Sequence, residues 1–261
     1  MEPAQEKGSS SGLGAIPIER LGFTLHKGAF RDVLCLRYCW DIQLAPLKCR
    51  CGAEFEVNHV LTCRQGGYHT IRHNELRNTL ASLLREVCQE VSTEPRLQPL
   101  NREWLPQSAN KEPNARLDNV ARGYWDSIQD AFFDVRVFHP FAPSYYNQKL
   151  LSTYNQHEQK KRLEYGQRVR ELEHDSFTPL VCTTTGSTAP EATVFLKRLA
   201  SMLAEKRGEQ YSTTMAWLRC ITGFCLLRSS LRCLRASPSR EKCCINLDSI
   251  SLAVSDGRLG Q

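Results

Sequence analysis

The chain has 261 residues, of which 41% are apolar and 24% charged, so it is neither a disordered chain nor too short to bury a sizeable core. No apolar run approaches the roughly 18 residues of a membrane helix, and the start "MEPAQEKGSSSG" lacks the basic and then apolar order of a secretory signal. We therefore expect a soluble, intracellular protein with no membrane partner. The formal net charge of +6 suits a polyanionic partner such as nucleic acid.

Residues 1–40 are expected to form an N-terminal extension. It combines a Gly/Ser-rich tip with the apolar segment "LGFTLHKGAFRDVLCLRYCW", for which we expect a helix or a helical turn. Most of the twelve cysteines of the chain stand singly in apolar surroundings, as buried thiols do, whereas three fall within "CRCGAEFEVNHVLTC". This distribution favours reduced cysteines and one local metal site, within residues 41–69.

The candidate ligands of that site are Cys49, Cys51, His59 and Cys63, which have one, seven and three residues between them. Tetrahedral zinc needs four such ligands, and pairs that are close in sequence supply them with little loss of chain entropy. Gly52 allows the backbone to bend after the second cysteine. A set of unligated thiols beside a chance histidine is the alternative, because one residue between the first two cysteines is fewer than usual. With four protein ligands no position stays open, so we expect a structural zinc.

Residues 70–186 are expected to form the core domain. The chain predicts a helix over 70–91 from its apolar stripe, a strand at "TEPRLQPL", a loop from 101 to 114, and two short extended pieces, "RLDNVA" and "AFFDVRVF". A charged helix over 150–173 and a strand in "SFTPLVCTTTG" follow. This order of helices and strands indicates an α/β or α+β layered domain.

Residues 187–236 are expected to be helical, and residues 237–261 a disordered tail. The first of these helices opens with a Thr-x-x-Glu capping box at Thr188 to Glu191, with Pro190 in its first turn. The second runs from about Tyr211 to Arg235. The tail shows no sustained apolar pattern.

Asp134 is out of place in "AFFDVRVF", a run otherwise rich in Phe and Val. Because alternate residues of a strand face opposite sides, Phe132, Asp134, Arg136 and Phe138 share one face, and the other face is entirely apolar. A buried carboxylate must be paired or must bind a cation. An ion pair with an arginine at a sheet edge is the simplest interpretation of Asp134 alone.

Asp118 in "RLDNV" offers a second carboxylate sixteen positions earlier. A turn between the two extended pieces can place both carboxylates side by side, where they repel each other unless a divalent cation lies between them. A magnesium ion held there could polarise a phosphate, lower the pKa of a bound water and stabilise the departing oxygen. We therefore expect a magnesium site at Asp118 and Asp134.

Such a site also needs a cation that orients the attacking water. Arg136 shares a face with Asp134, but it stays protonated and cannot act as a base. On the following helix, 3.6-residue periodicity places Lys161 on the inward face and Lys160 away from it, although a solvated basic helix face remains the alternative. Lys161 is therefore the first candidate. Glu75, in "RHNELRN", borders the apolar stripe of the first long helix and either completes the acidic site or is simply exposed.

These motifs together resemble the restriction-like endonuclease domain found downstream of the reverse transcriptase in site-specific non-LTR retrotransposons. The resemblance spans roughly residues 15–235. It rests on Cys49, Cys51, His59 and Cys63, then on "RLD" at 116–118, Asp134 in "FFDVRV" and Lys161 in "KKRLEY". The sequence departs from that family at Leu117, where proline is usual, and at Arg136, where the older form of the motif has its lysine.

The resemblance implies a PD-(D/E)xK nuclease fold, which is a small mixed central sheet flanked by helices. It further implies a magnesium-dependent endonuclease, or a retroelement-derived remnant of one, that nicks DNA to expose a 3′-hydroxyl for priming. The expected partner is DNA, with RNA or a reverse transcriptase module as further partners, and nuclear residence follows only from the DNA substrate. The alternatives are an inactive nucleic-acid-binding module and a non-functional retroelement fragment.

Basic residues after the acidic site are expected to neutralise phosphates, which would make DNA binding sensitive to salt. They are Arg162, Arg168, Arg170, Lys197, Arg198, Lys206 and Arg207.

Overall fold

A four-stranded mixed sheet is the centre of the protein. The computed structural model describes residues 12–14, 17–19, 22–100 and 105–235. The strands are β1 (Val91–Thr93), β2 (Asn119–Arg122), β3 (Asp130–Phe138) and β4 (Ser176–Thr183), in the order β1-β2-β3-β4. β2 pairs antiparallel with both β1 and β3, and β4 pairs parallel with β3. The expected mixed sheet flanked by helices is thus confirmed.

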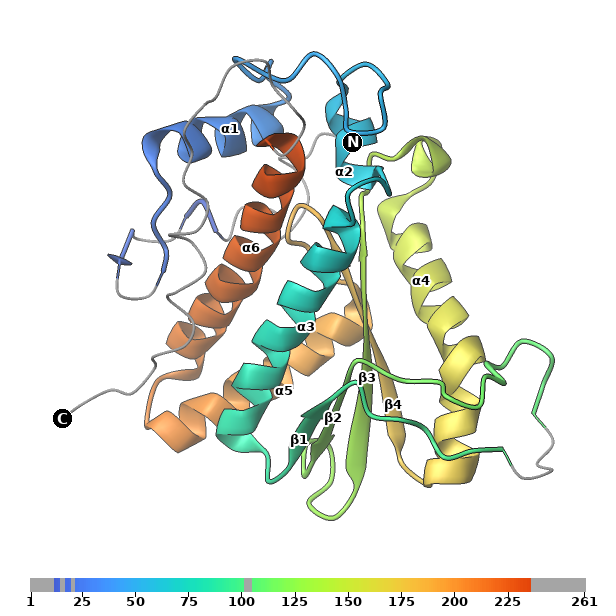
Figure 1. Cartoon of the computed structure of the whole chain (residues 1–261). Helices are drawn as coiled ribbons and strands as arrows, with labels where there is room; N and C mark the ends of the chain where they lie inside the picture. Colours follow the sequence, from blue (N-terminus) through green and yellow to red (C-terminus); the bar gives the residue numbers. More distant parts are fainter. Residues whose placement is uncertain (1–11, 15–16, 20–21, 101–104, 236–261) are drawn as a thin grey trace.

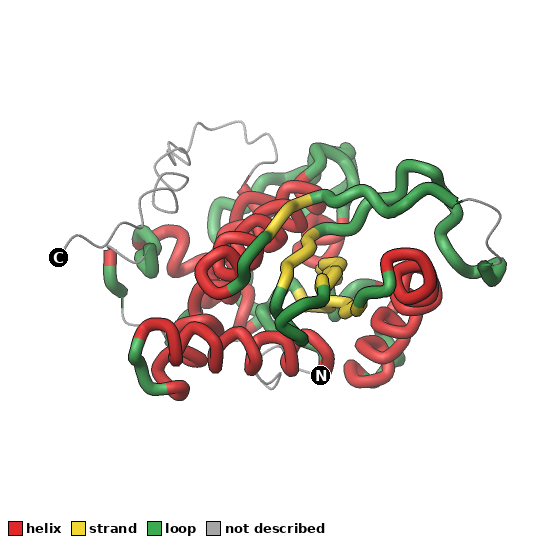
Figure 2. The backbone as a smooth tube through the Cα atoms, turned by 90° about the horizontal axis from the view of Figure 1, so that it is seen from below, coloured by secondary structure: helices red, strands yellow, loops and turns green. Residues whose placement is uncertain are grey.

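Helices cover both faces of this sheet (Figures 1 and 2). On one side lie α3 (Tyr68–Val87) and α5 (Pro190–Arg207), with α6 (Tyr211–Arg235) packed against both of them. On the other side lies α4 (Leu150–Lys161), which connects β3 to β4. It continues directly into two π-helical turns, Arg162–Gly166 and Val169–Glu173. A parallel pair needs a crossover of this kind because the chain must return to the same end of the sheet.

The two faces of β3 have the composition that the alternation predicts. Ala131, Phe133 and Val135 belong to the main core cluster beneath α3 and α5. Phe132 packs with the π-helical residues Tyr165 and Val169, and Phe138 packs with Tyr154 of α4. Asp134 therefore lies between two apolar contacts on the α4 face of the sheet.

The N-terminal part of the chain packs against α6. Helices α1 (Lys27–Tyr38) and α2 (Val57–Thr62) form a separate apolar cluster with the last turns of α6, in which Val33, Val60 and Leu234 are buried. Asp32 of α1 is almost fully buried and forms an ion pair with Arg235. Residues 27–38, the segment around the cysteines and the C-terminal helix are thus one packed unit. The predicted disordered tail, 237–261, lies outside the described residues.

Three local expectations differ from the structure. The predicted strand at 93–100 is wrong except at its start, because β1 ends at Thr93 and Glu94 takes a left-handed conformation with φ of 53°. The capping box is also wrong, since the N-cap of α5 is Ala189, and the N–H of Glu191 in the first turn donates to Glu158 Oε1 of α4 at 2.9 Å. The charged helix over 150–173 is α-helical only as far as Lys161.

The end of the β4 edge of the sheet is covered by the chain that follows β4. After β4 the backbone turns back, so that Thr183 N–H donates to Ser187 O and Ala189 N–H donates to Val181 O, each at 2.9 Å. No helix in the described ranges is both long and apolar enough to cross a membrane.

Candidate functional site

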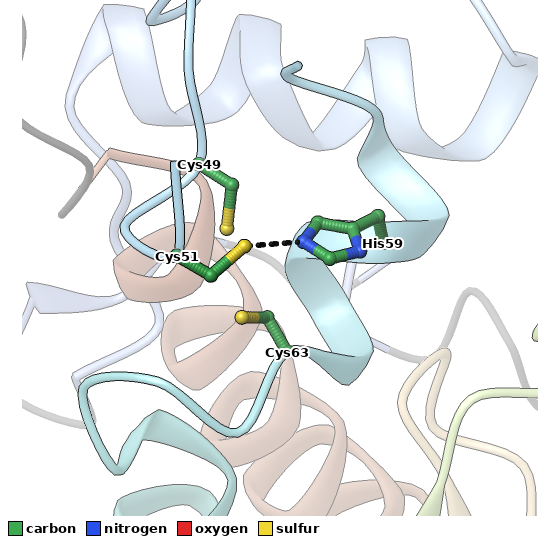
Figure 3. Close-up of side chains that lie close together, drawn as sticks. All are labelled: Cys49, Cys51, His59 and Cys63. Carbon is green, nitrogen blue, oxygen red and sulfur yellow. Dashed lines mark hydrogen bonds between the residues drawn. The ribbon is translucent and has the colours of Figure 1, made fainter. Parts of the chain in front are cut away.

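The four predicted zinc ligands converge on one point (Figure 3). Cys49 and Cys51 lie in a tight turn closed by the Lys48–Glu54 bridge, in which Gly52 has φ of 92° and Cys49 N–H donates to Ala53 O. His59 lies on α2, and Cys63 directly follows this helix. Their ligand atoms all lie within 4.8 Å of one another. Sulfur atoms around a tetrahedral zinc are about 3.8 Å apart, so this cluster could bind zinc.

The electrostatics of the cluster fit a cation. Hydrogen bonds from the backbone of Ala53 and from His59, whose Nε2 lies 3.0 Å from the Cys51 sulfur, lower the pKa of Cys51 to about 7. Burial instead raises the pKa of Cys63 to about 11. Without a cation the cluster therefore holds one easily formed thiolate, at Cys51, beside the Cys63 thiol, which resists ionisation. A bound zinc would make every cysteine ligand a thiolate.

Two buried hydrogen-bonded side chains connect the cysteine cluster to the sheet domain. Arg72 of α3, only 2% exposed, donates to the carbonyl of Leu61, which is the penultimate residue of α2. His139, which follows β3, lies between Asn58 of α2 at 2.9 Å and Thr184, after β4, at 2.8 Å. Helix α2 is thus hydrogen-bonded both to α3 and to the residue that follows β3.

Asp118, the residue just before β2, lies opposite Asp134 of β3. Asn119 pairs with Phe133, so continuing this antiparallel register by one residue places Asp118 across from Asp134. Cross-strand neighbours share a face of the sheet. Both residues are less than 10% exposed, and the charge of Asp118 helps to raise the pKa of Asp134.

Lys161 compensates the charge of Asp134. Its Nζ lies 2.8 Å from Asp134 Oδ2. Burial nevertheless raises the pKa of Asp134 to about 6, because the loss of hydration outweighs the attraction of the lysine. Burial lowers the pKa of Lys161, but the negative charge of Asp134 and its hydrogen bond more than offset this, so that pKa lies above its ordinary value. Lys161 is therefore protonated at neutral pH.

Asp118 is held by α3 and by β3. The pairing of β2 with β3 does not extend beyond Asn119, the first residue of β2. The N–H of Val135 therefore donates to Asp118 Oδ2, at 2.6 Å. His73 Nε2 lies 3.1 Å from the same oxygen and 2.9 Å from the carbonyl oxygen of Val135. One carboxylate oxygen thus receives two donors, and Oδ1 is the oxygen left to face other groups.

Of the expected site residues, the structure brings together Asp118, Asp134 and Lys161. Lys160 is exposed. Glu75 does not reach this group, because its carboxylate accepts from Ser229 and pairs with Arg232 on α6. The expected contribution of Glu75 is therefore not supported, and the α3 residue at the acidic site is His73. His73 precedes Leu76 and Leu80 by three and seven residues, so helical period places it on the side of α3 that carries these buried residues, but this spacing does not indicate which group His73 contacts.

Arg136 lies on the face of β3 that α4 covers, near His157. Its positive charge contributes to lowering the pKa of His157 on that helix, after burial, which has the larger effect. Its Nε is buried and has no hydrogen-bond partner among the described residues. A guanidinium in this position adds positive charge to the α4 face of β3 and does not replace Lys161 beside Asp134.

Most of the basic residues expected to contact phosphates have partners within the protein. Arg168 is fully buried, and its guanidinium donates to the carbonyls of Gln98, Asn110 and Glu112. The structure thus contradicts a role for Arg168 in contacting phosphate. Arg162 and Arg207 form ion pairs with Glu191 and Glu86. Arg170 and Lys197 are exposed and remain candidates.

Comparison with known proteins adds no family assignment: no protein-family model matches the chain, and a search of curated proteins finds no match. In the described part of the chain, only the Cys49 to Cys63 cluster brings three or more metal-ligating side chains close together.

Proposed function

We propose that the protein is a magnesium-dependent DNA endonuclease of the PD-(D/E)xK type, derived from a retroelement. The observation that carries the proposal is the meeting of Asp118, Asp134 and Lys161 beside the middle of β3, from three separate segments of the chain. The mixed sheet, with a helix before β1 and a second helix between β3 and β4, agrees with the fold that the sequence resemblance implies.

Each residue has a distinct task in this mechanism. Asp118 Oδ1 and the carboxylate of Asp134 would hold the magnesium ion, which would activate a water and stabilise the departing oxygen. Lys161, which is protonated, orients the attacking water and stabilises negative charge on the phosphate. The apolar contacts of Phe132 and Phe138 on either side keep this face of the sheet largely free of bulk water.

The cysteine cluster has a structural task in the proposal. Cys49, Cys51, His59 and Cys63 would hold zinc with no open coordination position. The substrate would be genomic DNA, nicked to expose a 3′-hydroxyl for priming of reverse transcription. A reverse transcriptase module and its RNA are the matching partners, and nuclear residence follows from the substrate.

A nucleic-acid-binding module without cleavage is the second candidate function. One observation favours it: Asp134 is paired with Lys161, and Asp118 Oδ2 already receives two donors, so the carboxylates are compensated within the protein. In that case the acidic residues stabilise the fold and bind no cation.

Nicking of supercoiled plasmid with magnesium separates the two candidates. We expect the wild-type protein to convert closed circles to nicked circles, and Asp134→Asn to reduce the rate by at least about 100-fold. Asp130→Asn is the matched control, since Asp130 lies at the start of the same strand, away from Asp134. This variant should cleave plasmid at the wild-type rate. Wild-type protein that binds plasmid and leaves it closed would contradict the nuclease proposal.

A further inference from the structure

The acidic site includes a residue of α3 that the motif does not contain. The ring of His73 lies beside both the carboxylate of Asp118 and the backbone of Val135. Its side chain is 31% exposed, so a histidine here is not simply part of the apolar core. Nδ1 lies 3.3 Å from Asn74 Oδ1, and the contacts of Nε2 indicate what the ring does at the acidic site.

The proton on Nε2 follows from the partners of that nitrogen. A carbonyl oxygen can only accept, and Val135 O lies 2.9 Å from Nε2, so Nε2 must carry a hydrogen. The same N–H also points to Asp118 Oδ2 at 3.1 Å. His73 therefore donates a hydrogen bond shared between the carboxylate and the strand to which Asp134 belongs.

This hydrogen bond fixes the rotation of the Asp118 carboxylate. Val135 N–H and His73 Nε2–H both hold Oδ2, from β3 and from α3, so the group cannot turn Oδ2 toward Asp134 without breaking two bonds. Oδ1 then faces the space beside Asp134. A ligand carboxylate held in this way needs little reordering when it binds a cation.

The ring itself is held through its neighbour. Arg72, the preceding residue, is buried and donates to the carbonyl of Leu61 at 2.9 Å, two residues before Cys63. The start of α3 is thus fastened to the helix that carries His59. The cysteine cluster and the acidic site are connected through two consecutive residues.

We propose that His73 is a positioning residue, whose Nε2–H donor orients the Asp118 carboxylate for cation binding. The part that concerns a cation rests on the proposed function, whereas the orientation of Asp118 does not. In this proposal the important feature of His73 is an N–H donor at the position of Nε2, and a positive charge on the imidazole ring is not required.

Two amide substitutions test this position. Glutamine can place an N–H near the Nε2 position, whereas the shorter asparagine cannot reach it. Both variants are polar, asparagine is similar to histidine in helix propensity and glutamine is a better helix former, and the site is partly exposed, so both should fold. Thermal unfolding checks this. We expect His73→Asn to accelerate hydrogen exchange of the Val135 amide by about tenfold, through loss of a hydrogen bond to a charged group, and His73→Gln to leave it near the wild-type rate.

Manganese binding, followed by electron paramagnetic resonance without DNA, is the second measurement. We expect His73→Asn to weaken it by about 10-fold or more and His73→Gln to keep it near the wild-type value. Unchanged Val135 exchange in His73→Asn, or equal acceleration in both variants, would overturn the positioning role. Acceleration in His73→Asn alone, with wild-type protein that binds no manganese at Asp134, would sustain the positioning role and reject the nuclease proposal.

Discussion

Lys160 and Lys161 are adjacent in sequence and differ completely in environment. Lys160 is exposed, whereas Lys161 lies against Asp134 and Tyr165 on the buried side of the helix. The difference follows from helical geometry, because consecutive residues are rotated by about 100° around the helix axis. These two lysines therefore offer a matched pair of substitutions for the chemistry at Asp134.

Lys161→Met should abolish most cleavage with little effect on DNA affinity. The substitution removes the donor that orients water, for which losses of about 100-fold or more are typical, whereas DNA binding sums many phosphate contacts. Plasmid nicking and fluorescence anisotropy with labelled DNA measure the two effects. Lys160→Met should behave as the wild type in both assays. Equal loss of cleavage in the two variants would contradict the assignment of Lys161.

The carboxylates and the lysine could be predicted from the sequence, and the α3 contact could not. Strand alternation places Asp134 on the mixed face, and helical period separates Lys161 from Lys160; both are local rules. Whether Glu75 or His73 reaches the acidic site depends on how α3 crosses the sheet. Ser229 and Arg232, which bind Glu75, are more than 150 residues away in sequence, so no local pattern reveals them.

At the scale of elements, long periodic segments could be predicted from the sequence, whereas short elements could be predicted only in part. Helices α3, α5 and α6 follow from apolar stripes, and β3 and β4 follow from apolar runs bounded by turns. β1 has only three residues, and its position depends on pairing with β2. Tyr165 and Val169, in the π-helical turns after Lys161, pack with Phe132 and Phe177, and no pattern within the helix itself reveals these contacts.

Removal of one cysteine ligand should lower both the zinc content and the stability of the protein. We expect Cys63→Ser to lower the free energy of unfolding by about 3 to 5 kcal/mol, a fall in Tm of roughly 6 to 20 °C, because a bound zinc stabilises only the folded state. Zinc content by atomic absorption and differential scanning calorimetry measure this. Cys39→Ser is the control, since Cys39 is exposed and outside the cluster. Equal zinc content and Tm in all three proteins would argue against a zinc site.

At the scale of the whole molecule, two buried histidines predict loss of stability in mild acid. Burial, together with nearby positive charge, lowers the pKa of both His139 and His157 to about 4. Arg72 faces His139, whereas Arg136 and Lys160 face His157. Between about pH 6.5 and pH 4 the unfolded chain binds these protons and the folded protein does not, so stability falls as pH falls.

Urea unfolding at pH 7 and at pH 5.5, with zinc in excess, measures this loss. The slope for one fully buried histidine is up to about 1.4 kcal/mol per pH unit. His139→Gln keeps all zinc ligands and a polar partner for Asn58, so its stability should depend less on pH than that of the wild type. Identical pH dependence in the two proteins would rule out His139 as a source of the effect.

The return of the chain beside β4 has a consequence for behaviour at high concentration. An open sheet edge is a template on which strands of other molecules can add, and this leads to aggregation. Here residues 187–189 already occupy backbone groups of Val181 and Thr183, and Pro179 presents no N–H at all. The most apolar strand of the protein therefore lies at an edge that resists intermolecular strand addition.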